Sequence, residues 1–339
     1  MLKAALIGFG GITASHRKGY YNLEKESKVK LVAAYDINPE SFVKRATINL
    51  GDSGEPMSEG LHFYTDLEEM LAKEEIDFVD ICIPTYKHRE LSEKLLRLGY
   101  HVLCEKPMSL TYADCAEMIR AAKESGRELM IGQCLRFYPS FDYIKAAIDD
   151  GRFGKVIGGL FTRLSPPPTW GWENWFMNPE RSGGCITDLH IHDIDVIRYL
   201  FGEPEEVSCR ANTSVCLHDT VHTSLFYGNT PITAIGDWSL TGVPFSQRAQ
   251  VNFEKATLIF DGTSLTVYPK DGAKSYEIEL EKVSGYQGEI SFFCDVIEGR
   301  TKNTKNTATS AAETINLIEH MRKSAENCGE TIKFEPKSK

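Results

Sequence analysis

The first 36 residues constrain the fold more than any other part of the chain. An apolar run over residues 2–7 leads directly into the glycine turn of residues 8–13, and a second apolar run over residues 29–35 ends in Asp36. A strand, a glycine turn, a helix and a second strand that ends in an acid form a binding site for a dinucleotide. We therefore predict a Rossmann domain at the start of the chain.

Each part of this pattern has a role toward the cofactor. Gly8 allows a tight turn, and Gly10 lets the backbone approach a pyrophosphate because it has no Cβ. The helix that follows offers N–H groups and the positive end of its dipole to that anion. Asp36 can accept hydrogen bonds from the ribose hydroxyls and repels a 2′-phosphate, so NAD is favoured over NADP. Thr13 replaces the usual third glycine, and an ordinary strand–turn–helix without a nucleotide is the alternative interpretation.

Composition narrows the class of protein. A chain of 339 residues exceeds the size at which one core usually stops growing, so two domains are expected. The net charge of −10 disfavours nucleic acids and anionic membranes as partners, and no apolar run is long enough to span a bilayer. The nine scattered cysteines contain no C-x-x-C pair, which predicts reduced thiols in a cytoplasmic protein. The stretch before Gly8 is too short to be a signal peptide.

Alternating strands and helices predict a doubly wound parallel sheet over residues 1–132, which we interpret as the NAD-binding domain. The expected elements are strands at 76–83, 101–105 and 129–132 and helices at 88–98 and 111–125. Ligands of such sheets bind at the carboxyl ends of the strands. Gly8, Asp36, Pro84 and Lys106 follow four of these ends, so we expect them along one edge.

From about residue 150 the pattern changes to strands joined by short turns. The expected strands are 156–164, 207–215, 221–227, 233–240, 247–253, 256–261, 264–268 and 275–280. They predict a large, mostly antiparallel open sheet in an α+β domain over residues 133–339, for substrate binding and oligomerisation. We expect helices around 184–200, 289–298 and 309–327 to cover one face. The exposed sheet predicts a homodimer or homotetramer.

Lys106 is the first candidate catalytic residue, because it stands between Glu105 and Pro107 directly after an apolar strand. Near a cleft, a lysine can donate to a substrate hydroxyl, or lose its proton when burial lowers its pKa. The alternative is a solvated lysine at a strand end.

The run over residues 182–195 carries the second set of candidates. Its apolar spacing predicts one helix on which Asp188 and His192, four residues apart, share a face. His192 suits a general base near neutral pH, and Asp188 can orient it or bind a hydroxyl. The alternatives are a solvated helix face and a metal site that includes His190. We expect no metal, because His190 and His192 point to different faces of a helix.

Together these motifs resemble the Gfo/Idh/MocA family of oxidoreductases. The resemblance rests on the glycine turn with His16, the run 84–88, Glu105 to Pro107, Arg136-Phe137, and the run 183–195. Glu-Lys-Pro followed by Asp-x-x-x-His is its most specific part, and it covers essentially the whole chain. It implies a Rossmann domain followed by a C-terminal α/β domain with an open sheet, often used for dimer or tetramer contacts.

By motif position, the resemblance implies a catalytic trio of Lys106, Asp188 and His192. Such enzymes transfer a hydride between a sugar or polyol carbon and the nicotinamide, and the pattern over residues 188–195 is especially similar to inositol dehydrogenases. His192 would take the hydroxyl proton, and Lys106 would stabilise charge on the same oxygen. The residues expected to bind the cofactor are Gly8, Phe9, Gly10, Gly11, Ile12, Asp36, Pro84, Thr85, His88, Glu105 and Lys106. For His88, opening the helix is the alternative to a place beside the nicotinamide.

A tryptophan-rich loop over residues 166–175 fits a sugar or polyol substrate. Trp170 and Trp172 can stack on the C–H faces of a sugar ring, or fill a domain or subunit contact instead. Arg136 and Arg163 favour an acidic sugar or form salt bridges. The residues expected to bind substrate are Arg136, Trp170, Trp172, Asp188 and His192.

The predicted function is therefore an NAD-dependent dehydrogenase that acts on CH–OH groups of a sugar, inositol or other polyol. One alternative is a glycosidase that oxidises and re-reduces one carbon with bound NAD and releases no net NADH. The other is a regulator that senses NAD or a sugar, which needs neither Lys106 nor His192.

Overall fold

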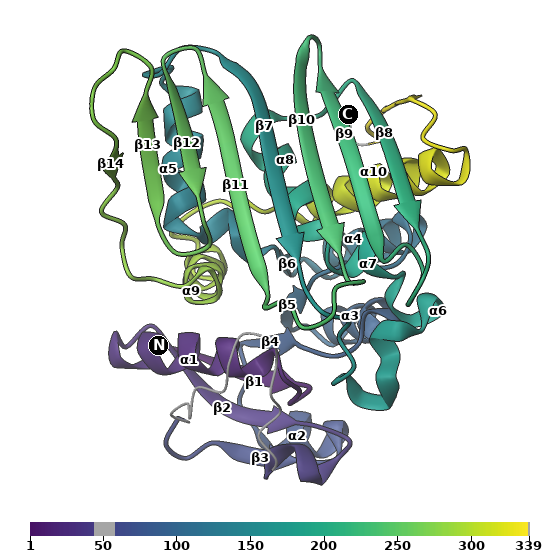
Figure 1. The fold of residues 1–339 in the computed structure, drawn as a ribbon. Coiled ribbons are helices and arrows are strands. Elements are labelled where there is room, and N and C mark those ends of the chain that lie inside the picture. The colour runs from purple at the N-terminus through teal and green to yellow at the C-terminus, as the bar shows by residue number, and fades with distance from the viewer. Residues whose placement is uncertain (44–57, 338–339) are drawn as a thin grey trace. The chain divides into compact units, whose positions relative to one another are not determined.

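The computed structural model describes residues 1–43 and 58–337, and the contacts within the chain divide it into two compact units (Figure 1). The first unit comprises Met1–Cys134, Thr169–Trp175 and Ser284–Ala312, and the second comprises Leu135–Pro168, Phe176–Val283 and Glu313–Lys339. The boundary expected between residues 132 and 133 stays a prediction. None of the described helices is both long and apolar enough to cross a membrane.

The first unit is built on a six-stranded sheet in the order β3-β2-β1-β4-β5-β6, and every neighbouring pair is parallel. This confirms the doubly wound sheet. The order reverses between β1 and β4, and such a reversal opens a crevice for ligands beyond the strand ends. The strands are β1 (Leu2–Ile7), β2 (Val29–Tyr35), β3 (His62–Tyr64), β4 (Phe78–Ile81), β5 (His101–Glu105) and β6 (Leu129–Gly132).

Local sequence explains where the helices of the first unit begin and end. Thr111 accepts the backbone N–H of Asp114 and so caps α4, and Gly126 ends that helix with a left-handed φ of 64°. Helix α1 runs to Lys25, so it fills most of the stretch between the glycine turn and β2. The helices are α1 (Thr13–Lys25), η1 (Pro39–Phe42), α2 (Leu67–Lys73), η2 (Thr85–Lys87), α3 (His88–Arg97) and α4 (Tyr112–Ser125).

Helix α9 (Gly285–Ile297) corrects one expectation. We expected this helix to cover the antiparallel sheet, and that was wrong, because it packs against α1, β5 and β6 of the first unit. The ring of Phe293 packs edge-on against Phe78, with centroids 5.4 Å apart. Apolar periodicity identifies the buried face of a helix, but it does not say which sheet that face covers.

The second unit contains a nine-stranded sheet in the order β14-β13-β12-β11-β7-β10-β9-β8-β15. Its pairs are antiparallel except for β7 with β10, which confirms the mostly antiparallel sheet. The strands are β7 (Val156–Leu164), β8 (Glu206–Asn212), β9 (Thr220–Tyr227), β10 (Thr230–Asp237), β11 (Ser246–Phe253), β12 (Ala256–Phe260), β13 (Leu265–Pro269), β14 (Tyr276–Glu277) and β15 (Ile332–Lys333).

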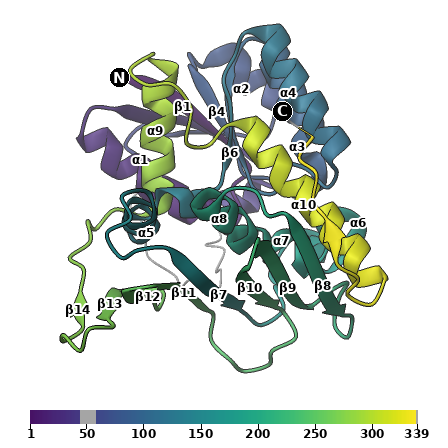
Figure 2. The same cartoon turned by 90° about the horizontal axis from the view of Figure 1, so that it is seen from above.

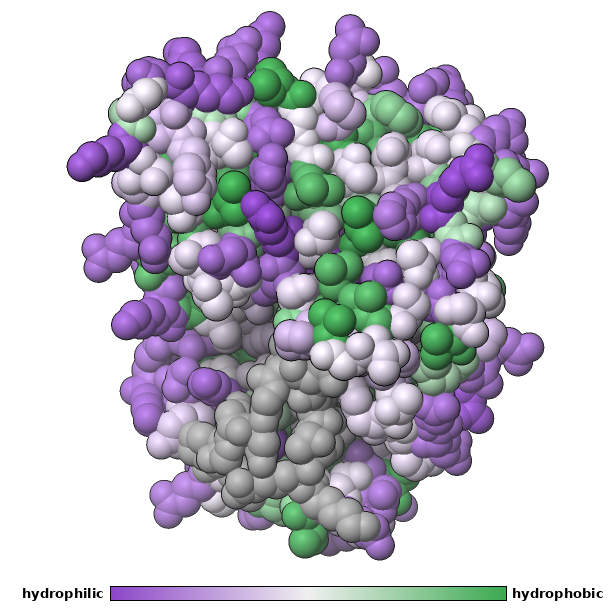
Figure 3. Space-filling view, viewed as in Figure 1, coloured by the Kyte–Doolittle hydropathy of each residue, from purple (hydrophilic) through white to green (hydrophobic). Residues whose placement is uncertain are grey.

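Helices cover one face of this sheet, as Figure 2 shows for α5 (Pro139–Asp149) and α8 (Ile191–Phe201). Phe161 of β7 points to that face, where its ring contacts Phe201 at a centroid distance of 6.2 Å. On the other face no described helix covers the strands of this unit, and Leu160 is 37% exposed. Figure 3 shows apolar and polar residues mixed there, without one large apolar patch. The remaining helices are η3 (Cys134–Phe137), η4 (Trp172–Met177), α6 (Pro179–Ser182), α7 (Cys185–Asp188) and α10 (Ala308–Glu326).

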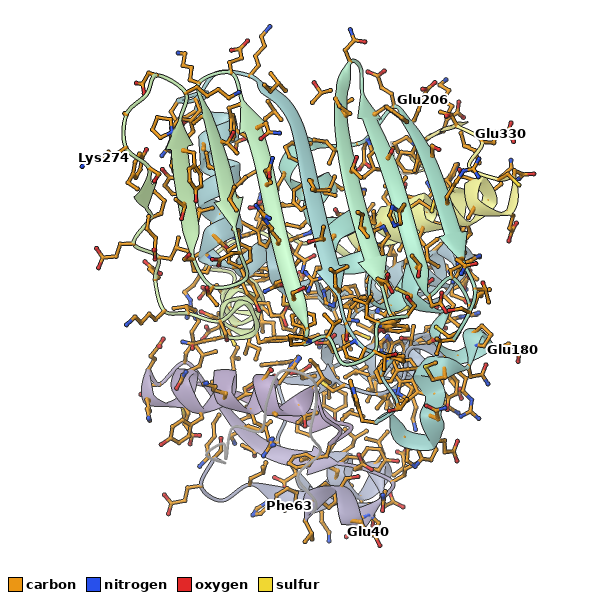
Figure 4. All side chains as sticks on the ribbon, viewed as in Figure 1. Glu40, Phe63, Glu180, Glu206, Lys274 and Glu330 are labelled. Atoms are coloured by element: carbon orange, nitrogen blue, oxygen red, sulfur yellow. The ribbon has the colours of Figure 1, made fainter. Side chains whose placement is uncertain are left out.

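Labelled charged side chains mark the periphery of the second unit in Figure 4. Glu206, Lys274 and Glu330 all point outward, and each is exposed.

Candidate active site

The glycine turn after β1 requires glycine at one position and leaves space at another. Gly8 has a φ of +91°, and a Cβ there would lie 2.4 Å from the carbonyl oxygen of Cys82, which follows β4. No atom lies within 4 Å of the place where a Cβ of Gly10 would be. The turn is therefore held tightly against the next strand, while the backbone at Gly10 is open to a ligand.

Helix α1 begins at this turn without a side-chain cap. Ile12 is its N-cap residue, and its first turn contains no acidic residue. The hydroxyl of Thr13 is buried and donates to the carbonyl oxygen of Gly10 at 2.6 Å. The first turn thus keeps the partial positive charge that binds anions such as phosphates.

Asp36 at the end of β2 faces the same turn. Its Oδ2 accepts the backbone N–H of Phe9 at 2.7 Å, and its Oδ1 accepts that of Asn38 at 2.8 Å. The ring of Phe9 packs against Phe42 and Phe63, with centroids 5.3 and 5.7 Å away. Figure 4 labels Phe63, which is 40% exposed, so this side of the turn offers an apolar surface beside a carboxylate.

The segment after β4 contributes a polar group without a partner. Pro84 is the N-cap residue of η2, without a side-chain capping bond, and Thr85 is the first residue of η2. Thr85 is 1% exposed, and its hydroxyl has no hydrogen-bond partner among the residues that the structure describes. A buried hydroxyl without a partner costs about 1–3 kcal/mol, so such a group favours a nearby ligand.

His88 was expected beside the nicotinamide, and its contacts favour the structural interpretation instead. It is fully buried, and its ring nitrogens lie 2.8 Å from the carbonyl oxygens of Pro107 and Ile83. Burial lowers its pKa, although both carbonyls oppose that shift. His88 therefore joins the segments that follow β4 and β5.

Lys106 follows β5 directly and is half-buried. The peptide bond between Lys106 and Pro107 is cis. The backbone N–H of Lys106 donates to Oε2 of Glu105 at 3.0 Å. Because all strands of this sheet run parallel, Lys106 lies at the same edge as the glycine turn, Asp36 and Thr85.

A buried polar cluster underlies this edge, and its composition was not anticipated from sequence. His16 of α1 is fully buried, with Nδ1 2.8 Å from Oδ2 of Asp80 and Nε2 2.8 Å from Oε1 of Glu105. The hydroxyl of Tyr20 donates to the same oxygen of Asp80 at 2.9 Å. Glu289 of α9 is also fully buried. His16, Asp80 and Glu105 all lie far from Glu289 in the sequence, so no sequence motif connects them with it.

Two pKa shifts describe the protonation of this cluster. Burial lowers the pKa of His16, but the charge and hydrogen bond of Asp80 outweigh that effect and raise this pKa well above its usual value. Burial raises the pKa of Glu289 well above its usual value; the charge of His16 opposes this shift, and the charges of Glu105 and Asp80 add to it. We therefore describe His16 as charged and Glu289 as neutral at neutral pH.

In the second unit, the structure divides the helix that was expected over residues 182–195. Helix α7 ends at Asp188, and α8 begins at Ile191. The single continuous helix was wrong, because the N–H of His190 bonds back to Cys185 and so widens the turn between the two helices. Asp188 and His192 therefore come from successive helices; Asp188 is 6% exposed and His192 is half-buried.

The neighbouring polar residues of α8 are held in buried ion pairs. Nε and one Nη of Arg136 bond both oxygens of Asp195 at 2.7 Å, and Arg136 is 2% exposed. Nε of Arg163 bonds Asp193 at 2.8 Å. The salt-bridge interpretation of both arginines is therefore confirmed, and the contact expected between Arg136 and substrate gains no support.

The tryptophan-rich loop exposes the two side chains that were expected to meet substrate. Trp170 is 40% exposed and Trp172 is 47% exposed, while Trp175 is buried. Glu173 and Asn174 adopt left-handed backbone conformations, with φ of 50° and 52°. Such conformations in residues other than glycine are often found at functional sites, because the surrounding structure has to hold them in place.

The structure thus gathers the expected cofactor residues at one edge of the first sheet. The residues at this edge are Gly8, Phe9, Gly10, Gly11, Ile12, Asp36, Pro84, Thr85, Glu105 and Lys106. Asp188 and His192 belong to the second unit. The glycine turn, Asp36 and Lys106 therefore lie together at the strand ends where parallel sheets of this kind bind ligands.

Two curated relatives extend over much of the chain. D-apiose dehydrogenase of Paraburkholderia graminis is 28% identical over 84% of this chain and 70% of its own length. Inositol 2-dehydrogenase of Rhizobium meliloti is 32% identical over 65% of this chain and 64% of its own length. A third relative, 2,7-anhydro-N-acetylneuraminate hydratase of Mediterraneibacter gnavus, is 36% identical, but the match spans only 42% of this chain and 38% of that protein.

Solved structures share the fold over nearly the whole chain. Aldose-aldose oxidoreductase from Caulobacter crescentus, complexed with glycerol, has a TM-score of 0.81 and 22% identity, and the match covers 98% of this chain and 99% of that one. Levoglucosan dehydrogenase, in complex with NADH and levoglucosan, has a TM-score of 0.81 and 19% identity, with the same coverage.

Two models of one family account for most of the sequence. Residues 2–133 match the oxidoreductase family with an NAD-binding Rossmann fold, and residues 141–259 match the GFO/IDH/MocA C-terminal domain. Both matches agree with the two sheets described above. The chain therefore belongs to the Gfo/Idh/MocA family of oxidoreductases.

Proposed function

We propose that this protein is an NAD-dependent dehydrogenase that transfers a hydride between a hydroxyl-bearing carbon of a sugar, inositol or other polyol and the nicotinamide. The observation that carries the proposal is the position of Lys106. It follows β5 at the edge that also presents the glycine turn and Asp36. A cation at this edge can meet the oxygen of a substrate that reacts with a bound dinucleotide.

The residues of the first unit fit NAD. The open backbone at Gly10 and the uncapped start of α1 suit the pyrophosphate, and Asp36 suits the ribose hydroxyls. The buried hydroxyl of Thr85 supplies one more hydrogen-bonding group. When bound, NAD supplies the hydride acceptor or donor. We propose NAD rather than NADP because the carboxylate of Asp36 repels a 2′-phosphate.

Three side chains then have complementary roles. His192 takes the proton of the substrate hydroxyl, Lys106 donates a hydrogen bond to that oxygen, and Asp188 holds a neighbouring hydroxyl. The alcohol carbon loses a hydride and its oxygen loses a proton, so the products are a carbonyl, NADH and a proton. Lys106 belongs to the first unit, and Asp188 and His192 belong to the second.

The names of the relatives support a sugar or polyol as the substrate. They include an apiose dehydrogenase and an inositol 2-dehydrogenase, and the similar structures include complexes with levoglucosan and glycerol. The exposed rings of Trp170 and Trp172 provide flat apolar surfaces for the C–H faces of such a molecule.

The experiment that tests this proposal measures NADH formation from NAD on a panel of inositols, aldoses, polyols and uronic acids. Wild type is compared with Lys106→Met, which keeps the length of the side chain without its charge. Turnover of a panel member that is lost in Lys106→Met supports the proposal. Equal turnover by both proteins, or NAD binding without turnover of any panel member, contradicts it.

One comparison favours a second candidate function. The name of the hydratase relative describes the addition of water, a reaction without net oxidation or reduction. The second candidate is therefore an enzyme that uses NAD transiently, with oxidation, elimination or addition, and re-reduction of one substrate. Product formation from glycosides or anhydrosugars, with retained cofactor and no net NADH, would identify this activity.

We also propose that the bare face of the nine-stranded sheet joins copies of the chain into a homodimer or homotetramer. The support is the absence of a covering helix in the described part of this unit, together with partly exposed apolar residues such as Ile157 and Leu160. Light scattering coupled to size-exclusion chromatography tests this, and a monomer at micromolar concentration contradicts it.

A further inference from the structure

His16 has two acceptors within hydrogen-bond distance, one on each side of its ring. Nδ1 lies 2.8 Å from Oδ2 of Asp80, and Nε2 lies 2.8 Å from Oε1 of Glu105. A neutral imidazole carries one N–H and can donate to only one of these oxygens. Both contacts are hydrogen bonds from the ring only when His16 carries two protons.

The remaining groups around the ring are consistent with this charge. Tyr20 of α1 donates its hydroxyl to Asp80, and Sγ of Cys82 in the segment after β4 lies 3.6 Å from the other oxygen of Asp80. Glu289 faces the cluster from α9, and neither of its oxygens has a hydrogen-bond partner among the described residues. A buried carboxyl without partners is neutral at ordinary pH, so it adds no third negative charge beside His16.

Glu105 connects His16 with the proposed catalytic lysine. Its Oε1 meets His16, and its Oε2 accepts the backbone N–H of Lys106 at 3.0 Å. Both Glu105 and His16 are buried, at 5% and 0% exposure. A shift in the Glu105 carboxylate is therefore transmitted directly to the backbone from which the Lys106 side chain starts.

We propose that His16 is a positioning residue that remains an imidazolium, clamps the carboxylate of Glu105 and thereby fixes the backbone of Lys106 for catalysis. This inference rests on the proposed function, because that function makes Lys106 a catalytic residue. His16 itself touches neither cofactor nor substrate in this proposal.

Two substitutions each keep one of the two hydrogen bonds of His16 and remove the other. In His16→Asn the amide nitrogen occupies the place of Nδ1 and keeps only the bond to Asp80. In His16→Gln it reaches the place of Nε2 and keeps only the bond to Glu105. We expect kcat to fall about 10- to 100-fold in His16→Asn and only about threefold in His16→Gln, with the KM for substrate little changed in both, because misplacement of a reacting group lowers kcat.

Tyr20→Phe is the matched control, since it removes a buried hydrogen bond from the Asp80 end of the same cluster. We expect it to lower the midpoint of thermal unfolding and to leave kcat within about twofold of wild type. Equal losses of kcat in the Asn and Gln variants, or a loss in Tyr20→Phe as large as that in His16→Asn, would overturn the positioning role.

A second measurement does not depend on turnover. In ¹⁵N-labelled holoprotein at pH 8, with His16→Gln as the assignment control, we expect two ring N–H signals from His16. One N–H signal, or a stoichiometric bound metal ion in place of a ring proton, overturns the imidazolium. If wild type turns over no substrate but shows both signals, the proposed function is refuted, and the imidazolium of His16 between Asp80 and Glu105 is still supported.

Discussion

His16 and His190 are both fully buried histidines, one in each unit, but their pKa values are shifted in opposite directions. His16 lies between the carboxylates of Asp80 and Glu105. His190 bonds the hydroxyl of Thr223 at 3.0 Å and packs against Gly236, with no carboxylate on its ring in the described structure. Burial, together with the charge of Arg163, lowers the pKa of His190 to about 3, whereas Asp80 raises that of His16 despite equal burial.

The difference shows that burial alone does not decide the charge of a histidine. The same desolvation acts on both rings, and the neighbouring groups determine which protonation state survives. His16 is connected through Glu105 to Lys106, whereas the ring of His190 bonds only the hydroxyl of Thr223 among the described residues and feels the charge of Arg163. The charged His16 holds carboxylates near the proposed site, whereas the neutral His190 is part of the core of the second unit.

The largest expected effect is on catalysis and concerns Lys106, whose backbone N–H bonds Glu105 of the His16 cluster. Lys106→Met should lower kcat by about 10³-fold or more, because a donor to the reacting oxygen is lost. Lys28→Met is the matched control, since Lys28 forms a half-buried ion pair with Asp295 in the same unit. Steady-state NADH formation checks the prediction, and losses of similar size in both variants would remove Lys106 from the chemistry.

Removal of each histidine should affect stability unequally. His16→Leu leaves two buried carboxylates without their cation and should lower the free energy of unfolding by about 3–5 kcal/mol. His190→Leu leaves only the hydroxyl of Thr223 without this partner, which should cost about 1–3 kcal/mol. Urea denaturation at pH 7 measures both values. A larger loss in His190→Leu would reverse the comparison.

The two histidines should also give opposite pH dependences of stability. His16 has a raised pKa in the folded state, so its contribution is present below about pH 6.5 and is lost as the pH rises toward that raised pKa. His190 has a lowered pKa of about 3, so its contribution is present above about pH 6.5 and is lost as the pH falls. Each slope is at most about 1.4 kcal/mol per pH unit.

Unfolding free energies at pH 5, 6.5 and 8, taken as differences between wild type and each leucine variant, isolate these contributions. The His16 difference should shrink between pH 6.5 and 8, and the His190 difference should shrink between pH 6.5 and 5. Slopes of the same sign would mean that the two rings share one protonation state.

The smallest expected effect concerns cofactor choice in the first unit. Asp36→Ala should weaken the preference for NAD over NADP by about tenfold, because the repulsion of a 2′-phosphate and a bond to the ribose are both lost. Asp66→Ala, at the cap of α2 in the same unit, is the control. Fluorescence titration with NADH and NADPH checks the ratio. An unchanged ratio would restrict Asp36 to its bonds with Phe9 and Asn38.

The parts of the fold that local patterns encode can be predicted from the sequence. Both sheets were predicted because the glycine turn, the strand–helix alternation and the later period-two strands are local signals. The division between α7 and α8 was not, because apolar spacing continues across the widened turn at His190. The partner of α9 was not either, because a long-range contact such as Phe78 with Phe293 leaves no trace in either segment alone.

The candidate site shows the same limit. Lys106 and Asp36 were placed correctly at one edge because both directly follow strands of a parallel sheet. The cluster around His16 was missed as a unit, since Asp80 reads as one more residue of a strand and Glu289 as one acid in an apolar helix. Only the folded chain reveals that these groups face one another.

The measurement that tests the central claim most directly follows a deuterium atom. The substrate identified by the panel is labelled with deuterium at its carbinol carbon and incubated with unlabelled NAD and the protein, and the NADH is examined by mass spectrometry. Direct hydride transfer predicts one deuterium in each NADH formed, and almost no NADH when Lys106→Met replaces wild type. Product that forms while the nicotinamide acquires no deuterium would contradict the account.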